Sequence, residues 1–221
     1  MWCATINGHM LLIAAHIDDF ILVCADRDTS DTFRTNLLAR FDGTYEGAVH
    51  TYLGCEIERD IPAGRTLLSQ RHFAEDVLRT FEMWDCIPAL TPMKPGTRFT
   101  KEQSNPSPDP TFHRRYRTIP GQAHMDAALH VLRYLRGTHD QAILYQQVDT
   151  LVDTLWGWVD SDWEADVDSR RSHTGYIIML NGGVVSWKSR RQDCVSLSTS
   201  EAEYVAASQW GQEVYYMRDP S

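Results

Sequence analysis

Prolines divide this 221-residue chain more clearly than any other feature of its sequence. Seven of its nine prolines fall between Pro88 and Pro120, in a stretch that also carries glycine, serine and asparagine. Because proline interrupts helices and central strands, the stretch is typical of a linker. We therefore predict a folded unit over 1–93, a proline-rich linker over 94–123, a connecting helix within 124–150 and a second folded unit over 151–221.

The first unit is predicted to hold two hairpins and two helices. Two apolar runs, His9–His16 and Phe20–Ala25, flank a short acidic break, which predicts a hairpin. Thr29 or Ser30 is expected to cap the helix that follows. The remaining elements expected here are a hairpin over Thr51–Arg59 and Thr66–Ser69 and a helix over about Arg71–Met83. This order predicts a sheet with helices packed on one side.

The second unit is predicted to begin with a helix over Met125–Arg136, which Gly137 is expected to end. The sequence Asn181-Gly182-Gly183 is a strong hairpin signal, and Ser198 and Glu201 form the capping box of a final helix. The remaining elements expected here are strands over Leu155–Trp163, His173–Leu180 and Val184–Ser189, with the final helix running to about Met217. Both units are thus predicted to be α+β.

Composition and charge narrow the class of protein. Thirty acidic and twenty-one basic residues give a net charge of −9, which disfavours a nucleic-acid binder with the usual basic surface. Five scattered cysteines without C-x-x-C spacing indicate a reducing compartment. The most apolar stretch, Met10–Ala25, contains Asp18 and Asp19, and each aspartate costs ~2.5–3.5 kcal/mol inside a membrane helix. We expect an intracellular chain with no membrane segment and no secretory signal.

The adjacent pair Asp18 and Asp19 lies where the first hairpin is expected to turn. Aspartate is common in turns because it tolerates left-handed backbone angles and bonds its own main chain. Two carboxylates at the tip of a rigid apolar hairpin can also hold Mg²⁺, a hard cation that prefers oxygen ligands. The apolar flanks favour the metal site, and the simple turn stays an open alternative.

Acidic residues recur at every second position from Asp160 onward. Asp160 and Asp162 point to the same face of a strand because they are two residues apart. A calcium loop starting at Asp160 is excluded, since its sixth position would be Ala165 and its twelfth Arg171. The acids after Asp162 are expected to form a solvated loop.

Glu203 is the candidate partner of Asp160. It is predicted to project from the first turn of the last helix, where it can meet the strand that carries Asp160. An aspartate from a strand and a glutamate from a helix make a plausible two-carboxylate metal site. Capping and the helix dipole explain Glu201 without a catalytic role.

Basic residues gather in two places. A charged cluster is most often a solvated surface, but it can also contact a phosphate backbone. The candidate nucleic-acid-binding residues are Arg114, Arg115, Arg117, Arg133 and Arg136, with His113 beside them. A second cluster consists of Lys188, Arg190 and Arg191.

Several motifs in order resemble one known family. The segments HMLLIAAHIDDFILVC, TYLGCEIERD, LLSQRHFAEDVL and TPMKPG are similar to the reverse transcriptase of copia-type LTR-retrotransposon Pol polyproteins (Pseudoviridae-like). The segments VLRYLRGT, GWVDSDWEADVDSRRSHTGYIIMLNGGVVSWKSRRQ and VSLSTSEAEYVAA resemble the connection and ribonuclease H region of the same polyproteins. The resemblance covers nearly the whole chain and keeps the family's order.

This resemblance implies roles for individual residues. Asp18 and Asp19 match the aspartate pair that binds the catalytic Mg²⁺ ions of the polymerase, and His16 stands where the family usually has an aromatic residue. Asp160 matches the first acid of the ribonuclease H site and Glu203 matches its helix glutamate. Asp162 is expected to support these metal ligands without binding the metal itself. The implied fold is a partial reverse-transcriptase palm (1–93), then a linker, a connection helix and an incomplete ribonuclease H-like sheet with helices (151–221).

The sequence also departs from the family's pattern. The chain starts just before the Asp18–Asp19 hairpin, so the strand with a further palm aspartate is expected to be missing, as are the last ribonuclease H acids. Helical family sequence is expected to be deleted between Ile119 and Pro120. Two-metal phosphoryl transfer needs several carboxylates around ions ~3.5–4 Å apart.

We therefore expect a truncated, internally deleted and inactive relative of an RNA-directed DNA polymerase with ribonuclease H. The intact family acts on RNA–DNA hybrids, with Mg²⁺, in the cytoplasm or in virus-like particles. The alternatives are a chain that is active when paired with a complementary fragment and a nucleic-acid-binding remnant without catalysis.

Overall fold

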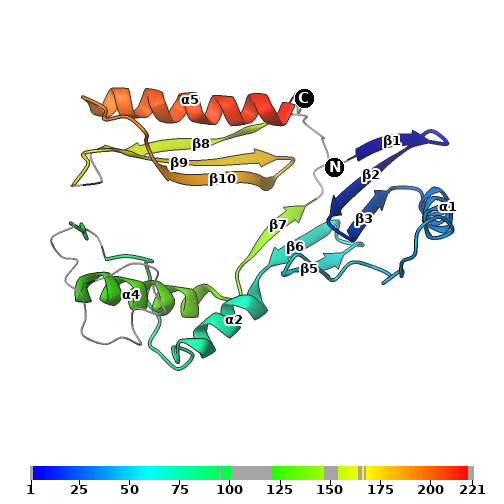
Figure 1. The fold of residues 1–221 in the computed structure, drawn as a ribbon, viewed down its shortest axis with the longest axis horizontal. Helices are drawn as coiled ribbons and strands as arrows, with labels where there is room; N and C mark the ends of the chain where they lie inside the picture. The colour runs from blue at the N-terminus through cyan, green and yellow to red at the C-terminus, as the bar shows by residue number, and fades with distance from the viewer. Residues whose placement is uncertain are drawn as a thin grey trace. The chain divides into compact units, whose positions relative to one another are not determined.

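The computed structural model describes residues 2–94, 96–100, 121–146, 154–163, 166 and 168–218. Helices and antiparallel sheets alternate along this part of the chain, so the predicted α+β class is confirmed (Figure 1). Two compact units are present, Met1–Tyr52 and Leu53–Ser221. The four-part organisation drawn from the prolines divides the chain differently and stays a prediction. Among the described residues, none of the helices is both long and apolar enough to span a membrane.

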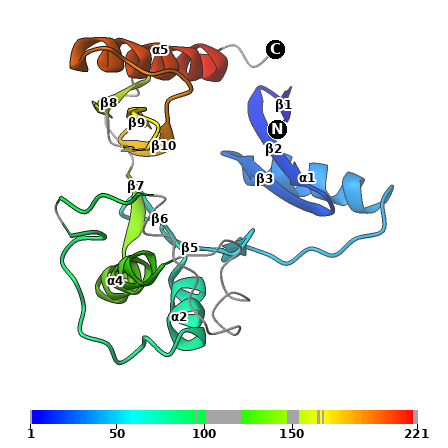
Figure 2. The ribbon, with the colours of Figure 1, turned by 60° about the vertical axis from the view of Figure 1, so that its left-hand side comes forward.

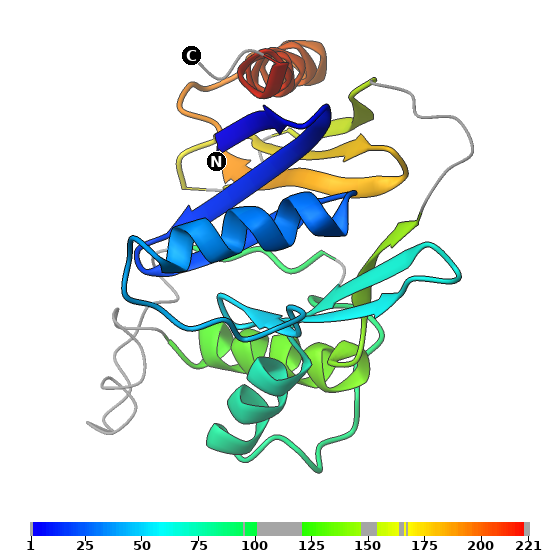
Figure 3. The same cartoon turned by 90° about the vertical axis from the view of Figure 1, so that its right-hand side faces the viewer.

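The first unit is a three-stranded antiparallel sheet with one helix. Its strands β1 (Trp2–Ile6), β2 (His9–His16) and β3 (Asp19–Cys24) pair in that order, and α1 (Arg27–Leu38) lies along the sheet (Figure 3). The β2–β3 hairpin was predicted, whereas β1 was missed although Asn7-Gly8 is a strong turn signal. Both turn residues have positive φ, 52° and 80°, which asparagine and glycine accept more readily than other residues.

The cap of α1 corrects the sequence prediction. Asp26, rather than Thr29 or Ser30, is the N-cap residue, and its Oδ2 accepts the backbone N–H of Thr29 at 2.8 Å. Hydrogen bonding by Thr29, first from its side chain and then from its backbone N–H, lowers the pKa of Asp26. The helix begins three or four residues earlier than expected because Asp26 adopts the extended conformation of a cap and Thr29 lies buried in the first turn.

Another sheet has four strands in the order β4-β5-β6-β7. The predicted β5–β6 hairpin is confirmed, but Leu53 and Gly54, with φ of 50° and 76°, separate β4 from β5 where one strand was expected. The prediction of a single sheet for the first 93 residues is wrong, because β1–β3 and β4–β7 are separate sheets. The strand bounds are β4 (Thr51–Tyr52), β5 (Cys55–Asp60), β6 (Arg65–Ser69) and β7 (Ala142–Gln146).

Helices α2 (Arg71–Thr80) and α4 (Gln122–Thr138) pack against each other. α2 ends before the predicted Met83. Gly137 stays inside α4 and does not cap it as predicted, since the C-cap is His139. A Cβ on Gly137 would come within 3.2 Å of the Cβ of Pro88, so glycine here allows a loop to approach the helix closely.

The third sheet pairs β8 (Trp156–Asp162), β9 (His173–Leu180) and β10 (Gly183–Arg191) in the order β10-β9-β8. The three strands and the β9–β10 hairpin were predicted, but their order in the sheet was not. A two-residue turn, Asn181-Gly182, joins β9 to β10 with φ of 49° and 80°. Helix α5 (Thr199–Arg218) runs along one face of this sheet (Figures 1 and 2).

The core of this sheet lies under α5. Tyr176 and Ile178 of β9 are 5% and 0% exposed, and Ala202 and Ala206 of α5 are fully buried. The serine hydroxyl of Ser186 donates to a carboxylate oxygen of Glu213 in α5 at 3.2 Å. Because Ser186 opposes Ile178 in the ladder, this bond identifies the face that α5 covers.

Candidate active site

Asp18 and Asp19 lie at the tip of the β2–β3 hairpin, as predicted. His16 pairs with Asp19, so Ile17 and Asp18 form a two-residue turn. Both carboxylates are exposed, with no apolar wall around the acids themselves. Six cross-strand pairs, from Leu11 with Cys24 to His16 with Asp19, hold the hairpin, so its tip is a firm place for two adjacent oxygen ligands.

Ile17 gives this tip an uncommon backbone. Its φ is 55° and its side chain is 88% exposed. A β-branched residue in the left-handed region is an outlier, because its Cβ substituents crowd the backbone. Such strain persists where the surrounding structure imposes it, and it gathers at functional sites. This observation favours a functional tip over an ordinary solvated turn, which would place asparagine or glycine here.

Asp160 lies on β8 with an exposed side chain, and its Oδ1 accepts the backbone N–H of Ser161 at 2.9 Å. In the ladder it opposes Gly175. Gly175 and Ile178 belong to opposite faces of β9, because they are three residues apart. Asp160 therefore projects from the face of the sheet that α5 does not cover.

Glu203 is exposed near the start of α5. The structure thus places the predicted pair on elements that contact each other, β8 and α5, but puts Asp160 on the uncovered face of the sheet. The two-carboxylate site of Asp160 and Glu203 stays a prediction. Within the described ranges, no group of three or more histidine, cysteine, aspartate or glutamate side chains is arranged to hold a metal ion.

Glu201 caps α5, as predicted. Its backbone N–H donates to Oγ of Ser198 at 3.2 Å, and its carboxylate accepts the N–H of Leu197 at 2.7 Å. The side chain that fixes this end of the helix to the sheet is Gln192, which sequence reasoning missed. Gln192 is 1% exposed and donates to Oγ1 of Thr174 at 3.1 Å and to the carbonyl of Ala202 at 2.9 Å.

Asp166 shows that the acidic run after β8 is partly structural. Its Oδ1 accepts the backbone N–H groups of Asp168 and Ser169 at 3.1 and 3.0 Å, and its Oδ2 pairs with Arg191. The backbone bond from Ser169, followed by the bond from Arg191, holds the pKa of Asp166 far below its usual range. Asp166 thus organises a local turn with Asp168 and Ser169, whereas Asp168 is exposed, as a solvated loop predicts, and Glu164 lies outside the described residues.

The candidate nucleic-acid-binding arginines fall into two groups, those outside the described residues and those on α4. Arg114, Arg115 and Arg117 lie outside the described residues. Arg133 donates from Nε to the carbonyl of Ile87 at 2.7 Å, and Arg136 donates from Nε to the carbonyl of Trp84 at 2.6 Å.

The Arg136 guanidinium also lies 4.5 Å from the centre of the Trp84 ring. Both half-buried arginines thus hold the loop after α2 against α4, which gives them a structural role that needs no nucleic acid. In the second basic cluster, Arg190 pairs with Asp193 at 3.1 Å and Arg191 with Asp166. A nucleic-acid contact for these residues stays a prediction.

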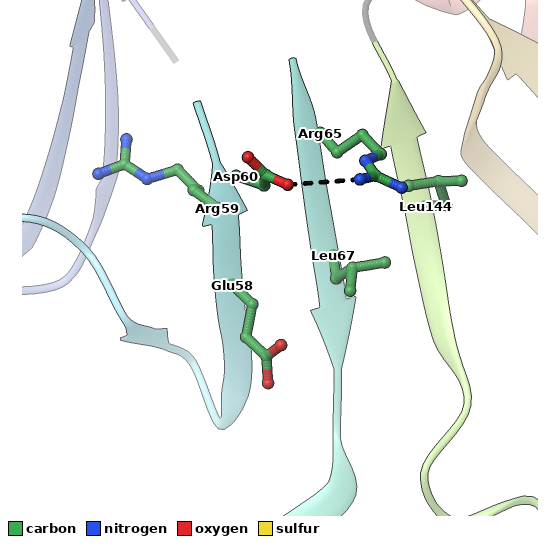
Figure 4. A pocket seen from close by; sticks show the side chains of 6 residues that line it. All are labelled: Glu58, Arg59, Asp60, Arg65, Leu67 and Leu144. Carbon is green, nitrogen blue, oxygen red and sulfur yellow. Dashed lines mark hydrogen bonds and ion pairs between the residues drawn. The ribbon is translucent and has the colours of Figure 1, made fainter. Parts of the chain in front are cut away.

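A shallow pocket on the β5–β6–β7 sheet was not expected from the sequence (Figure 4). Leu67 and Leu144 lie side by side in it, and Arg65 pairs with Asp60 at 3.4 Å. Asp60 also accepts the backbone N–H of Ala63 at 3.1 Å, so its carboxylate stabilises the hairpin turn. The pocket is lined by Glu58, Arg59, Asp60, Arg65, Leu67 and Leu144.

Comparison with known proteins identifies the class of residues 1–95 and then the family of the chain. The family model for reverse transcriptase (RNA-dependent DNA polymerase) matches residues 1–95, which include the Asp18–Asp19 hairpin. The chain is 29% identical over 243 residues to the retrovirus-related Pol polyprotein from transposon TNT 1-94 of Nicotiana tabacum, covering 96% of this chain and 18% of that protein. It is 29% identical over 232 residues to the retrovirus-related Pol polyprotein from transposon RE2 of Arabidopsis thaliana, covering 94% of this chain and 16% of that protein.

A third relative, the secreted RxLR effector protein 161 of Plasmopara viticola, is 41% identical over 103 residues, which cover 47% of this chain and 71% of that protein. No solved structure matches the chain. The chain belongs to the family of copia-type retrotransposon Pol polyproteins, as its motifs predicted. It spans less than a fifth of the length of the two polyproteins.

Proposed function

We propose that this chain is a catalytically incomplete relative of an RNA-directed DNA polymerase whose Asp18–Asp19 tip retains weak affinity for Mg²⁺. The observation that carries the proposal is the exposed acidic tip with the left-handed Ile17, inside the region that matches the reverse-transcriptase family. Two adjacent carboxylates fit a hard cation. When bound, Mg²⁺ supplies charge stabilisation at a phosphoryl oxygen.

Inactivity follows from the number of ligands. Within the part of the chain that the structure describes, no third acidic side chain joins Asp18 and Asp19. Two-metal phosphoryl transfer needs carboxylates that bridge and clamp both ions, and each 1.36 kcal/mol of lost transition-state stabilisation slows a reaction tenfold. One hairpin alone is therefore expected to bind an ion without performing the transfer.

The ribonuclease H part of the proposal rests on β8–β9–β10 and α5. The order of three antiparallel strands followed by a helix is compatible with such a unit, and the sequence places Asp160 and Glu203 on its first strand and its helix. In this proposal both acids are remnants of a hybrid-cleaving site, and an RNA–DNA hybrid is the ligand of the intact family.

An internal deletion is supported by the length of the alignments. The match to the Nicotiana tabacum polyprotein runs over 243 residues, which exceeds the 221 residues of the whole chain. That polyprotein therefore has residues within the aligned region that this chain lacks. We place the gap between Ile119 and Pro120, outside the described residues.

Metal binding and catalysis can be tested separately. Mn²⁺ added as a paramagnetic probe of the Mg²⁺ site should broaden the amide NMR signals of residues 16–20, and Asp18→Asn with Asp19→Asn should abolish the broadening. Extension of an oligo(dT) primer on poly(rA), and cleavage of the hybrid, should stay at the level of this double variant. Unchanged signals would refute the metal site. Mg²⁺-dependent extension that requires Asp18 would refute inactivity.

A further inference from the structure

The sheet β8–β9–β10 has an uncovered aromatic face, which we call the tryptophan face. It consists of Trp156, Trp158, Ile177 and Trp187, whose side chains are 44%, 61%, 41% and 63% exposed. Trp158 and Trp187 both oppose Ile177, one from each neighbouring strand, so these three side chains form a continuous row across the sheet. α5 lies on the other face, above Tyr176.

These tryptophans are not among the buried side chains of the described core. The buried side chains of β9 point toward α5, whereas Trp156 and Trp158 contact each other edge to face at 4.9 Å on the open side. Contiguous exposed apolar side chains usually mark an interaction surface. Tryptophan is especially frequent at the energetic centre of protein interfaces, because it offers a large contact area.

Acidic residues extend the same face. Asp160 and Asp162 follow Trp158 at steps of two residues along β8, which is about 6.7 Å per step. Both are exposed, and neither pairs with a basic side chain among the described residues. Arg191, which lies in the same row as Asp162, is already paired with Asp166. The face is therefore apolar at one end and negatively charged at the other.

We propose that the tryptophan face, together with Asp160 and Asp162, binds an extended arginine-rich segment of a partner protein. A guanidinium group stacks on a tryptophan ring and forms paired hydrogen bonds with a carboxylate. In an extended segment, side chains two residues apart point the same way at about 6.7 Å, which is the spacing from Trp158 to Asp160 and from Asp160 to Asp162. Without a bound divalent ion, both carboxylates repel phosphates, which disfavours nucleic acid at this face.

The test uses the full chain and a fluorescein-labelled decapeptide of alternating arginine and serine. We expect Trp158→Thr and Trp187→Thr each to weaken binding about five- to tenfold, and Asp162→Asn about threefold. Threonine keeps the strand preference of the replaced residue. Tyr215→Ala is the matched control, since Tyr215 is 71% exposed on α5, the helix on the opposite face, and it should stay within twofold of wild type.

Three controls decide the outcome. A peptide with glutamate in place of arginine should not bind, and each variant should keep the wild-type urea midpoint. Equal binding of the glutamate peptide, or equal weakening by Tyr215→Ala, would overturn the proposal. Tighter binding of dT10 than of the arginine peptide, or sedimentation showing that a second copy of the chain covers the face, would overturn it too. The proposal goes beyond the proposed function, and the metal titration at residues 16–20 tests that function independently.

Discussion

The buried amide of Gln192 is expected to be the main polar contact between α5 and the β8–β9–β10 sheet. It is 1% exposed and makes three side-chain hydrogen bonds, donating to Thr174 and Ala202 and accepting from Ser196 at 3.1 Å. Its partners Thr174 and Ser196 are 0% and 1% exposed, so water cannot replace the amide without rearrangement.

Gln192→Leu keeps the approximate volume but removes all three bonds. A typical hydrogen bond contributes about 1 kcal/mol net, and a buried group left without a partner costs about 1–3 kcal/mol. We therefore expect the free energy of unfolding to fall by about 3 kcal/mol. With a urea m value of about 1–3 kcal/mol/M, the midpoint should shift by about 1–3 M.

The assay is urea unfolding followed by circular dichroism, with amide hydrogen exchange to locate the change. Exchange should accelerate most in the first turns of α5. Gln212→Leu is the matched control, because Gln212 is exposed on α5, and its effect should stay within about 0.5 kcal/mol. A loss below about 1 kcal/mol for Gln192→Leu, or one equal to the control, would refute the role assigned to this network.

Three further predictions concern single positions. Glu56 accepts the backbone N–H of His72 at 2.8 Å, and this bond lowers the pKa of Glu56. Glu56→Ala should therefore lower the free energy of unfolding by about 1 kcal/mol, measured in urea at pH 7. The difference from wild type should shrink as pH falls through the lowered pKa, since protonation removes the charged acceptor. Ile17→Asn should raise stability by about 1 kcal/mol, because asparagine tolerates the left-handed backbone. Gly157→Ala should cost more than about 2 kcal/mol, measured by thermal unfolding, because its Cβ would overlap the Ile177 carbonyl oxygen.

Each of these has a control in the chain. Glu58→Ala, on the same strand and more exposed, should change stability by less than about 0.5 kcal/mol. Ile61→Asn should give no gain, because Ile61 is 76% exposed but does not have positive φ. Gly175→Ala should be tolerated, since its Cβ would meet no atom within 4 Å. A gain from Ile61→Asn equal to that from Ile17→Asn would show that backbone strain at Ile17 is not the cause.

The turns and caps of this chain could be predicted because their signals are local. Asn181-Gly182 gave the β9–β10 hairpin, and the acidic break after His16 gave the β2–β3 hairpin. The capping box at Ser198 and Glu201 marked the start of α5. Where local prediction failed, the cause was a competing neighbour, as when Asp26 capped α1 in place of Thr29.

The pairing of distant strands and the contacts of buried polar side chains could not be predicted from local signals. β7 pairs with β6 although helices α2 and α4 and the proline-rich stretch separate them in sequence. Arg133 and Arg136 looked like phosphate contacts until their hydrogen bonds to the loop after α2 were visible. Gln192 carried no signal, because a lone glutamine is buried only when distant groups satisfy its amide.

The sequence by itself determined the family, the α+β class and the position of Asp18 and Asp19 at a hairpin tip, because motif order and turn chemistry depend on neighbouring residues alone. Only the tertiary structure decided that the strands of the first 93 residues form separate sheets and that Asp160 shares an open face with tryptophans. The physical reason is that strand alternation gives two faces without saying which one a helix will cover. That choice depends on long-range packing, here on the contact of α5 with β8 and β9.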